Sequence, residues 1–134
     1  MVWCGGNPVI EFKVYVGKGG GELARVTEAL AAQAVNIRAI TSEAESAQPF
    51  YRIVTNDVNT TRKALNMAGL GYEENEILVS NLLDRPGELA KVARRLGRAN
   101  VHVSSLYILG SRDGKTEIAM TVDDFEGARK LLKA

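Results

Sequence analysis

The sequence predicts an α+β protein built from two similar halves, and three observations support this fold class. Residues 21–40 align with residues 87–106 at an offset of 87 − 21 = 66, without a gap. Segments with strand-like and helix-like periodicity follow one another in the same order in both halves. Glycine-containing turns separate these segments. Together the observations predict two tandem modules, over residues 9–75 and 76–134.

The repeat is more extensive than composition alone would produce. Seven of its twenty aligned pairs are identical, where average composition would give roughly one or two. The identical pairs are Gly21/Gly87, Glu22/Glu88, Leu23/Leu89, Ala24/Ala90, Val26/Val92, Leu30/Leu96 and Val35/Val101. A second block, Asp57 with residues 62–65, matches Asp124 with residues 129–132 at an offset of 124 − 57 = 67. Duplication of one module explains both blocks.

The elements of the first half follow from its periodicity. Residues 9–16 alternate between apolar and polar side chains, which is typical of a half-buried strand. Apolar residues then recur at three- and four-residue spacing from Leu23 to Ala34, which predicts one face of a helix. Residues 35–41 and 50–55 are expected to form two more strands. Asn56-Asp57 suits the start of a second helix that stops at Gly69, and another strand begins at Tyr72.

The second half repeats this plan up to its second helix. Its Asp113-Gly114 pair predicts a tight hairpin between the second and third strands, because both residues tolerate positive φ. The order βαββαβ is that of a ferredoxin-like sandwich. Because Ala134 aligns with Met67, the second module is expected to lack its last strand. We expect one long strand over residues 71–83 to serve both modules, with the vacant edge covered by a neighbouring chain or by the N-terminal residues.

Composition argues against several classes of partner. The 17 basic and 16 acidic residues leave a net charge of +1, which gives no reason to expect nucleic acid or a membrane surface as a partner. Cys4 is the single cysteine, so no intramolecular disulfide can form and a reducing compartment is the default. No apolar stretch approaches the roughly 20 residues that span a bilayer. We therefore expect a cytoplasmic protein.

A motif in the second half indicates a family. The segment Asp84-Arg85-Pro86-Gly87-Glu88-Leu89 lies between a predicted strand and a predicted helix, and Val101-His102-Val103 opens the next strand. This arrangement resembles the signature of the ACT-domain family. The resemblance implies a regulatory module that binds a small molecule, often an amino acid, at a domain or subunit interface.

The resemblance also implies which residues contact the ligand. Residues corresponding to the family's contacts are Asp84 and His102 in the second half, and Lys18 and Asn36 in the first. Pro86 suits the first helical position, and the backbone amides after it would favour a carboxylate at the helix N-terminus. The full set of candidate ligand-binding residues is Asp84, Arg85, Pro86, Gly87, Glu88, Leu89 and His102, with Lys18, Gly19, Gly20, Gly21 and Asn36.

Simpler roles remain open for several of these residues. Asp84 can merely favour the helix N-terminus electrostatically, and His102 can be a strand surface residue. The glycines at 19–21 can form a flexible turn, whereas Lys18 before them is expected to favour a more anionic ligand. Glu22 and Glu88 are interpreted as helix-capping residues.

Three classes of function compete. The favoured class is an amino-acid-binding regulatory protein that signals through contacts in a homodimer or higher homo-oligomer, or with an enzyme or regulator of amino-acid metabolism. The alternative is a ligand-free oligomerisation or interaction module. An enzyme is disfavoured because the sequence offers neither a nucleophile–base pair nor metal-ligand spacing, so no catalytic residue, metal or cofactor is expected. An RNA-binding role is disfavoured because residues 49–54 lack the glycine–aromatic pattern that stacks bases.

Overall fold

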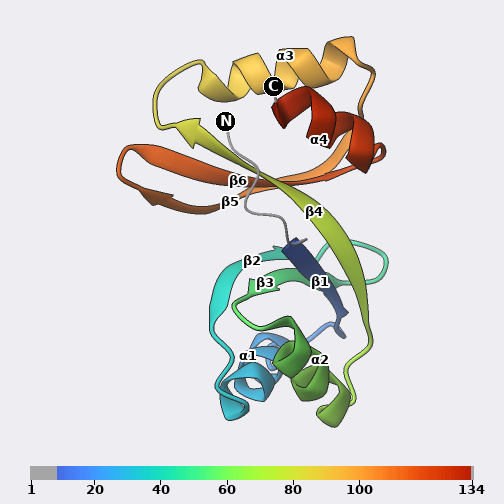
Figure 1. Ribbon diagram of the computed structural model, residues 1–134. Coiled ribbons are helices and arrows are strands. Elements are labelled where there is room, and N and C mark those ends of the chain that lie inside the picture. Colours follow the sequence, from blue (N-terminus) through green and yellow to red (C-terminus); the bar gives the residue numbers. More distant parts are fainter. Residues whose placement is uncertain (1–8, 134) are drawn as a thin grey trace. The chain divides into compact units, whose positions relative to one another are not determined.

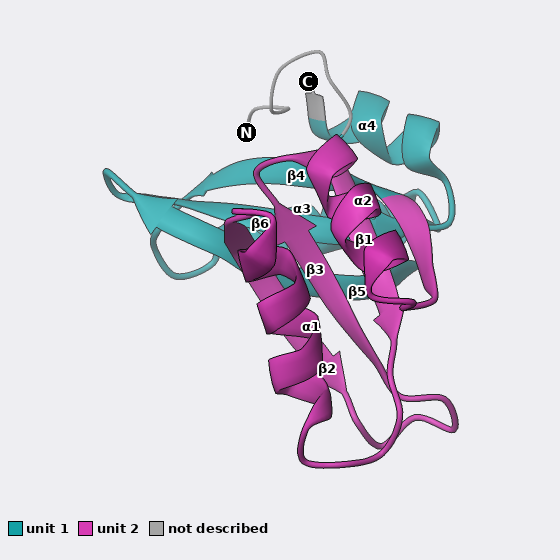
Figure 2. Ribbon diagram, turned by 90° about the horizontal axis from the view of Figure 1, so that it is seen from below, with its two compact units in different colours: residues 1–9, 76–134 teal, residues 10–75 magenta. Residues whose placement is uncertain are grey.

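The computed structural model describes residues 9–133, which divide into two compact units. The N-terminal unit is Ile10–Asn75, and the C-terminal unit takes in the described residues from Glu76 onward together with Val9 (magenta and teal in Figure 2). One strand, β4 (Tyr72–Leu83), belongs partly to each unit, so the single long strand expected at this point is found. The described residues form an α+β fold of six strands and four helices (Figure 1).

The N-terminal unit is a sheet covered on one side by two helices (Figure 1). Its strands lie in the order β2-β3-β1-β4, and β3 runs antiparallel to both β1 and β2. The elements that precede β4 are β1 (Val9–Tyr15), α1 (Glu22–Ala32), β2 (Ile37–Glu43), β3 (Phe50–Thr55) and α2 (Val58–Met67). Its core joins the inward face of the sheet to both helices through Phe12, Val14, Val26, Leu30, Ile53, Ala64 and Leu65.

The C-terminal unit repeats this layering around a second core. After β4 it contains α3 (Glu88–Arg98), β5 (Val103–Arg112), β6 (Lys115–Val122) and α4 (Phe125–Lys133). Its strands lie in the order β4-β6-β5, and β6 is antiparallel to both neighbours. Asp113 and Gly114, with φ values of 53° and 73°, form the tight β5–β6 hairpin that the sequence predicts.

The alternation of apolar and polar residues along β1 predicts which side chains face the core, but it does not predict that a polar side chain on the opposite face is also buried. Phe12 and Val14 face the core, as expected. Glu11 lies on the opposite face and is nevertheless fully buried. Its carboxylate accepts hydrogen bonds of 3.0 Å from Arg52 and from Asn75, which compensate a charge that burial alone would disfavour. The pattern of apolar and polar residues could not reveal this partnership between three separate strands.

The predicted start of α2 is confirmed. Asp57 is the N-cap residue, and its carboxylate accepts a hydrogen bond of 3.1 Å from the backbone amide of Thr60. Gly69, with a φ of +69°, follows the last turn of the helix. Cys4 and the N-terminal residues proposed to cover a sheet edge lie outside the described part of the chain.

Candidate functional site

The loop before α3 contains most of the candidate residues of the second half. Its backbone is tied to the β5–β6 hairpin, because the Asp84 amide donates to the carbonyl of Gly114 at 2.7 Å. Gly87 is the N-cap of α3 and has a φ of +89°, a left-handed conformation that favours glycine. Pro86 therefore lies in the turn before the cap. The expectation that Pro86 occupies the first helical position is wrong, because the helix can begin only after the left-handed residue.

Glu88 is held by two neighbouring cations. Its Oε1 accepts a hydrogen bond of 2.6 Å from Arg85 Nε and one of 3.2 Å from Lys91 Nζ. These contacts, Arg85 first, lower the pKa of Glu88 below its ordinary value. The observed partners of this carboxylate are thus side chains rather than the backbone amides that a capping role would use.

A pocket of about 350 Å³ lies beside this loop, within the C-terminal unit. It is formed by the end of β4, one face of α3 and the start of β6. Its charged lining residues are Glu88, Lys91, Arg95 and Lys115. Glu88 is the one candidate residue in the lining, and the three cations make the pocket basic.

His102 lies at the opposite end of α3 from Asp84. The helix has 11 residues, so its ends are about 16 Å apart. The His102 amide donates to Asp123 Oδ1 at 3.0 Å, and the Asp123 amide donates to the His102 carbonyl at 3.1 Å. This exchange ties the start of β5 to the end of β6. The C-terminal unit by itself therefore does not bring Asp84 and His102 together.

The N-terminal unit separates its candidate residues in the same way. Lys18 and the three glycines after it lead into α1 and are exposed, whereas Asn36 follows the far end of that helix. The Asn36 amide donates to Asn56 Oδ1 at 3.0 Å, and the Asn56 amide donates to the Asn36 carbonyl at 3.1 Å. This is the same exchange as that between His102 and Asp123. The equivalence extends the internal repeat from sequence to hydrogen bonding.

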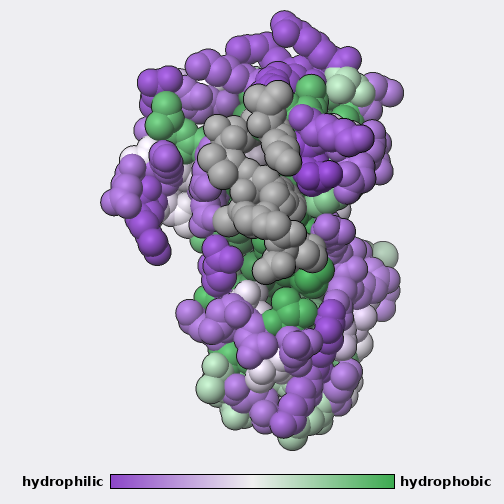
Figure 3. All heavy atoms as spheres, viewed as in Figure 1, coloured by the Kyte–Doolittle hydropathy of each residue, from purple (hydrophilic) through white to green (hydrophobic). Residues whose placement is uncertain are grey.

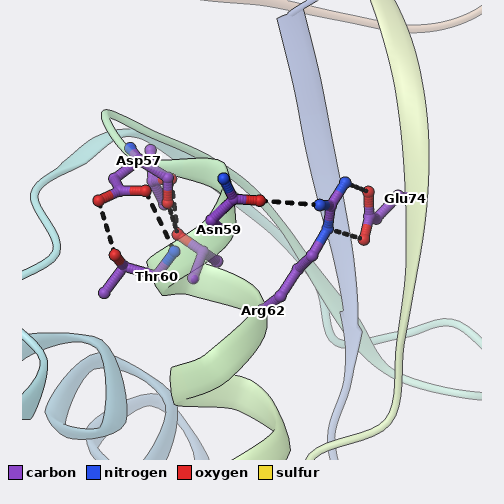
Figure 4. Close-up of polar contacts among 7 residues, drawn as sticks. Asp57, Asn59, Thr60, Arg62 and Glu74 are labelled. Carbon is purple, nitrogen blue, oxygen red and sulfur yellow. Dashed lines mark hydrogen bonds and ion pairs between the residues drawn. The ribbon is translucent and has the colours of Figure 1, made fainter.

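Polar residues at the start of α2 satisfy one another (Figure 4). Thr60 Oγ1 donates to Asp57 Oδ2 at 2.6 Å, and the hydrogen bonds from Thr60 lower the pKa of Asp57. Arg62 donates hydrogen bonds of 2.7 Å to both carboxylate oxygens of Glu74, and these bonds lower the pKa of Glu74. Arg62 also donates to the side-chain oxygen of Asn59 at 3.0 Å. The cluster joins α2 to β4 and is a structural network near Asn36 rather than an open site.

A second pocket, of about 290 Å³, lies beside the loop before α1. It is lined by that loop, by the turn between β2 and β3, and by the start of β3, all within the N-terminal unit. Its charged lining residues are Lys18, Glu22 and Glu45. Sequence reasoning assigned no ligand role to Glu22 or Glu45. Glu22 could have been noticed, because the repeat aligns it with Glu88 but gives it glycine in place of Arg85.

Apolar side chains are also exposed at equivalent positions of the two units. Leu23 and Ile40 in the N-terminal unit are 50% and 40% exposed, and their counterparts Leu89 and Leu106 are 39% and 44% exposed. On the face shown in Figure 3, hydrophilic residues predominate and apolar residues form separate patches. The exposure of these four side chains therefore follows the repeat.

Comparison with solved structures identifies the fold. The crystal structure of protein BT0572 from Bacteroides thetaiotaomicron matches with a TM-score of 0.86 at 21% identity, covering 94% of this chain and 87% of that chain. The ligand-free regulatory subunit of aspartate kinase from Thermus thermophilus matches with a TM-score of 0.62 at 14% identity, covering 93% and 90% of the two chains. The chain has the ACT-domain fold. Neither the protein-family models nor the curated proteins give a match.

The ACT fold also occurs as part of a larger enzyme. Aspartate kinase from Clostridium acetobutylicum matches with a TM-score of 0.61 at 14% identity, covering 94% of this chain but 32% of that chain. At these identities the likeness establishes the fold, and fold alone does not fix function. Within residues 9–133 no helix is long and apolar enough to cross a membrane. The same residues contain no group of three or more histidine, cysteine or acidic side chains placed to hold a metal ion.

Proposed function

We propose that this chain is an amino-acid-binding regulatory protein composed of two tandem ferredoxin-like modules, the second without its last strand. The observation that carries the proposal is a pocket in each unit beside the loop that precedes the first helix of that unit. Each pocket has charged groups at its lining and the size of a small-molecule site. The ACT fold adds support, because solved structures that share it include regulatory subunits of aspartate kinase.

The ligand sites are completed between subunits. In each unit the loop residues and the strand residue lie at opposite ends of an 11-residue helix, too far apart to touch one amino acid. A second chain that places its Asn36 or His102 near the loop of the first would close the site. Ligand binding then stabilises a homodimer or higher homo-oligomer, because both chains contribute contacts.

The regulated partner is an enzyme or regulator of amino-acid metabolism, and the protein acts without chemistry of its own in the cytoplasm. The signal passes through altered oligomer or partner contacts. Such coupling requires that the ligand bind one assembly state more tightly than another.

A thermal-shift screen of the twenty amino acids at millimolar concentration tests this function. A ligand that binds only the folded state raises the melting temperature by mass action. We expect at least one amino acid to do so, with a matching change in sedimentation coefficient. Absence of any shift, combined with a concentration-dependent oligomer, would favour the ligand-free interaction module. The exposed apolar side chains of Leu23, Ile40, Leu89 and Leu106 are candidate contacts for such a module.

A further inference from the structure

The carboxylate of Glu22 has an unused hydrogen-bonding position within the N-terminal pocket. Its Oε2 is buried and has no hydrogen-bond partner among the described residues. Arg25 Nη1 lies 3.7 Å away, within ion-pair range but beyond hydrogen-bonding distance. Arg25 is engaged elsewhere, because its Nη2 donates to the Ala68 carbonyl at the end of α2. A buried carboxylate oxygen without a hydrogen-bond donor is unfavourable. The Glu22 side chain is 23% exposed and lines the pocket, so a turn of this side chain would present the oxygen to a donor on a ligand.

The equivalent carboxylate in the C-terminal unit shows what is missing. Glu88 receives hydrogen bonds from both Arg85 and Lys91. Lys91 corresponds to Arg25, so both units have a cation at this position of the helix. Arg85 corresponds to Gly19, since 85 − 19 = 66, and glycine supplies no cation. The N-terminal unit thus keeps the carboxylate and the cation at position 25, which lies in ion-pair range, but lacks the hydrogen-bonding guanidinium that Arg85 supplies.

Glycines leave room for a ligand at this place. A Cβ added to Gly17 would lie 3.1 Å from Glu22 Oε1, so the backbone passes closely over the carboxylate. A Cβ at Gly19 would meet nothing within 4 Å. The pocket beside these residues, about 290 Å³ in volume, is large enough for a small molecule and also carries Lys18.

We propose that the N-terminal pocket binds a small primary amine, such as a free amino acid, through an ion pair between its ammonium group and Glu22. The inference rests on the proposed function and specifies which group of the ligand is recognised and by which unit. When the ligand is a zwitterion, Lys18 donates a hydrogen bond to its carboxylate. In the C-terminal unit Arg85 already occupies the corresponding position on Glu88, so that pocket does not select an ammonium group. The two pockets therefore recognise different ligand chemistry.

Isothermal titration calorimetry tests the assignment with each amino acid that shifts the melting temperature and with its N-acetyl derivative. The N-acetyl derivative lacks the ammonium group and should not bind detectably. Glu22→Gln should weaken binding on the order of 10- to 100-fold, because it removes one charge-assisted hydrogen bond. Glu28→Gln, an exposed position on the same helix, is the matched control and should bind as the unaltered protein does.

Gly19→Arg provides an independent variant. It installs the guanidinium that Glu88 has and should displace the ligand ammonium, whereas Gly19→Gln, of similar length without the charge, should weaken binding less. If Glu22→Gln and Gly19→Arg both retain full affinity for an amino acid that binds, the inference is wrong and the proposed function stands. If no amine-bearing compound binds the unaltered protein, both are wrong. Circular dichroism of each variant verifies that it folds.

Discussion

The loops that lead into α1 and α3 come from one duplicated segment, yet the equivalent glutamates that follow them have different hydrogen-bond partners. In the C-terminal unit Arg85 and Lys91 neutralise Glu88, and a left-handed glycine fixes the turn before the helix. In the N-terminal unit the corresponding Glu22 keeps a buried oxygen that accepts no hydrogen bond from residues 9–133. The contrast separates two roles that one module can play. A loop whose carboxylate is hydrogen-bonded to its own cations supports structure, whereas a loop whose carboxylate lacks such a hydrogen bond can receive a ligand.

The pockets differ in charge as well. Lys91, Arg95 and Lys115 outnumber Glu88 around the C-terminal pocket, whereas Glu22 and Glu45 outnumber Lys18 around the N-terminal one. The expectation that Lys18 makes the first loop select a more anionic ligand took no account of these two glutamates. They are brought to the pocket by the helix start and by the β2–β3 turn, so the sequence around the loop could not reveal both of them.

The largest effect is expected from the two cores, where the units should behave alike. Leu30 and Leu96 are equivalent and are 0% and 3% exposed. Truncating either to alanine removes buried methyl groups and leaves a cavity, at a cost of about 2–5 kcal/mol in unfolding free energy. Urea denaturation measures both variants. A cost below 1 kcal/mol at one position only would show that its unit is not packed as its counterpart is.

Much of the fold could be predicted because local chemistry specifies it. Asp57 caps α2 and Asp113-Gly114 turns the β5–β6 hairpin, and each feature depends on residues close together in the chain. The third strand, residues 50–55, is found with the expected bounds. Glu11 was not predicted to be buried, since its partners Arg52 and Asn75 lie 41 and 64 residues away. Long-range compensation of this kind leaves no periodic signal.

The candidate site was harder to predict from the sequence, because the length of the helix sets the distance between the candidate residues that flank it. Asp84 and His102 flank α3 in sequence and lie at its opposite ends in space. The role assigned to each of them stays a prediction. Glu22 was interpreted as a capping residue, and its free oxygen is visible only once the position of Arg25 relative to it is known. The repeat nevertheless indicated this difference, because Gly19 stands in the first half where the second half has Arg85.

A smaller effect should distinguish the turns before the two helices. Gly87 has a φ of +89°, whereas Gly21 has a φ of −94° in the right-handed region. Gly87→Ala should lower the unfolding free energy by about 1–2 kcal/mol, because a Cβ is unfavourable in the left-handed conformation. Position 21 does not adopt the left-handed conformation, so Gly21→Ala should change the unfolding free energy by less than about 0.5 kcal/mol. Equal losses in urea denaturation would contradict the structural difference between the loops.

The smallest effect concerns the acid dependence of stability in the C-terminal unit. Hydrogen bonds from Arg85 and Lys91 lower the pKa of Glu88 below its ordinary value of 4.5. A carboxyl group whose pKa is lowered by folding stabilises the protein above the unfolded value, and this contribution is lost as the pH falls through the folded value. Glu88→Gln should therefore be slightly less stable than the unaltered protein at pH 7. The difference should shrink below pH 4.5 and disappear once Glu88 is protonated in the folded state.

Unfolding free energies of both proteins, measured by urea denaturation from pH 7 down to pH 3, test this expectation. The side chains of Arg85 and Lys91 are exposed, so added salt should reduce the difference at pH 7 by screening the two ion pairs. A difference that persists unchanged at the lowest pH would mean that glutamine disturbs packing and that Arg85 does not act on Glu88 through charge. In that case the absence of an arginine at Gly19 would no longer explain why Glu22 is left open, and the contrast between the two loops would need another cause.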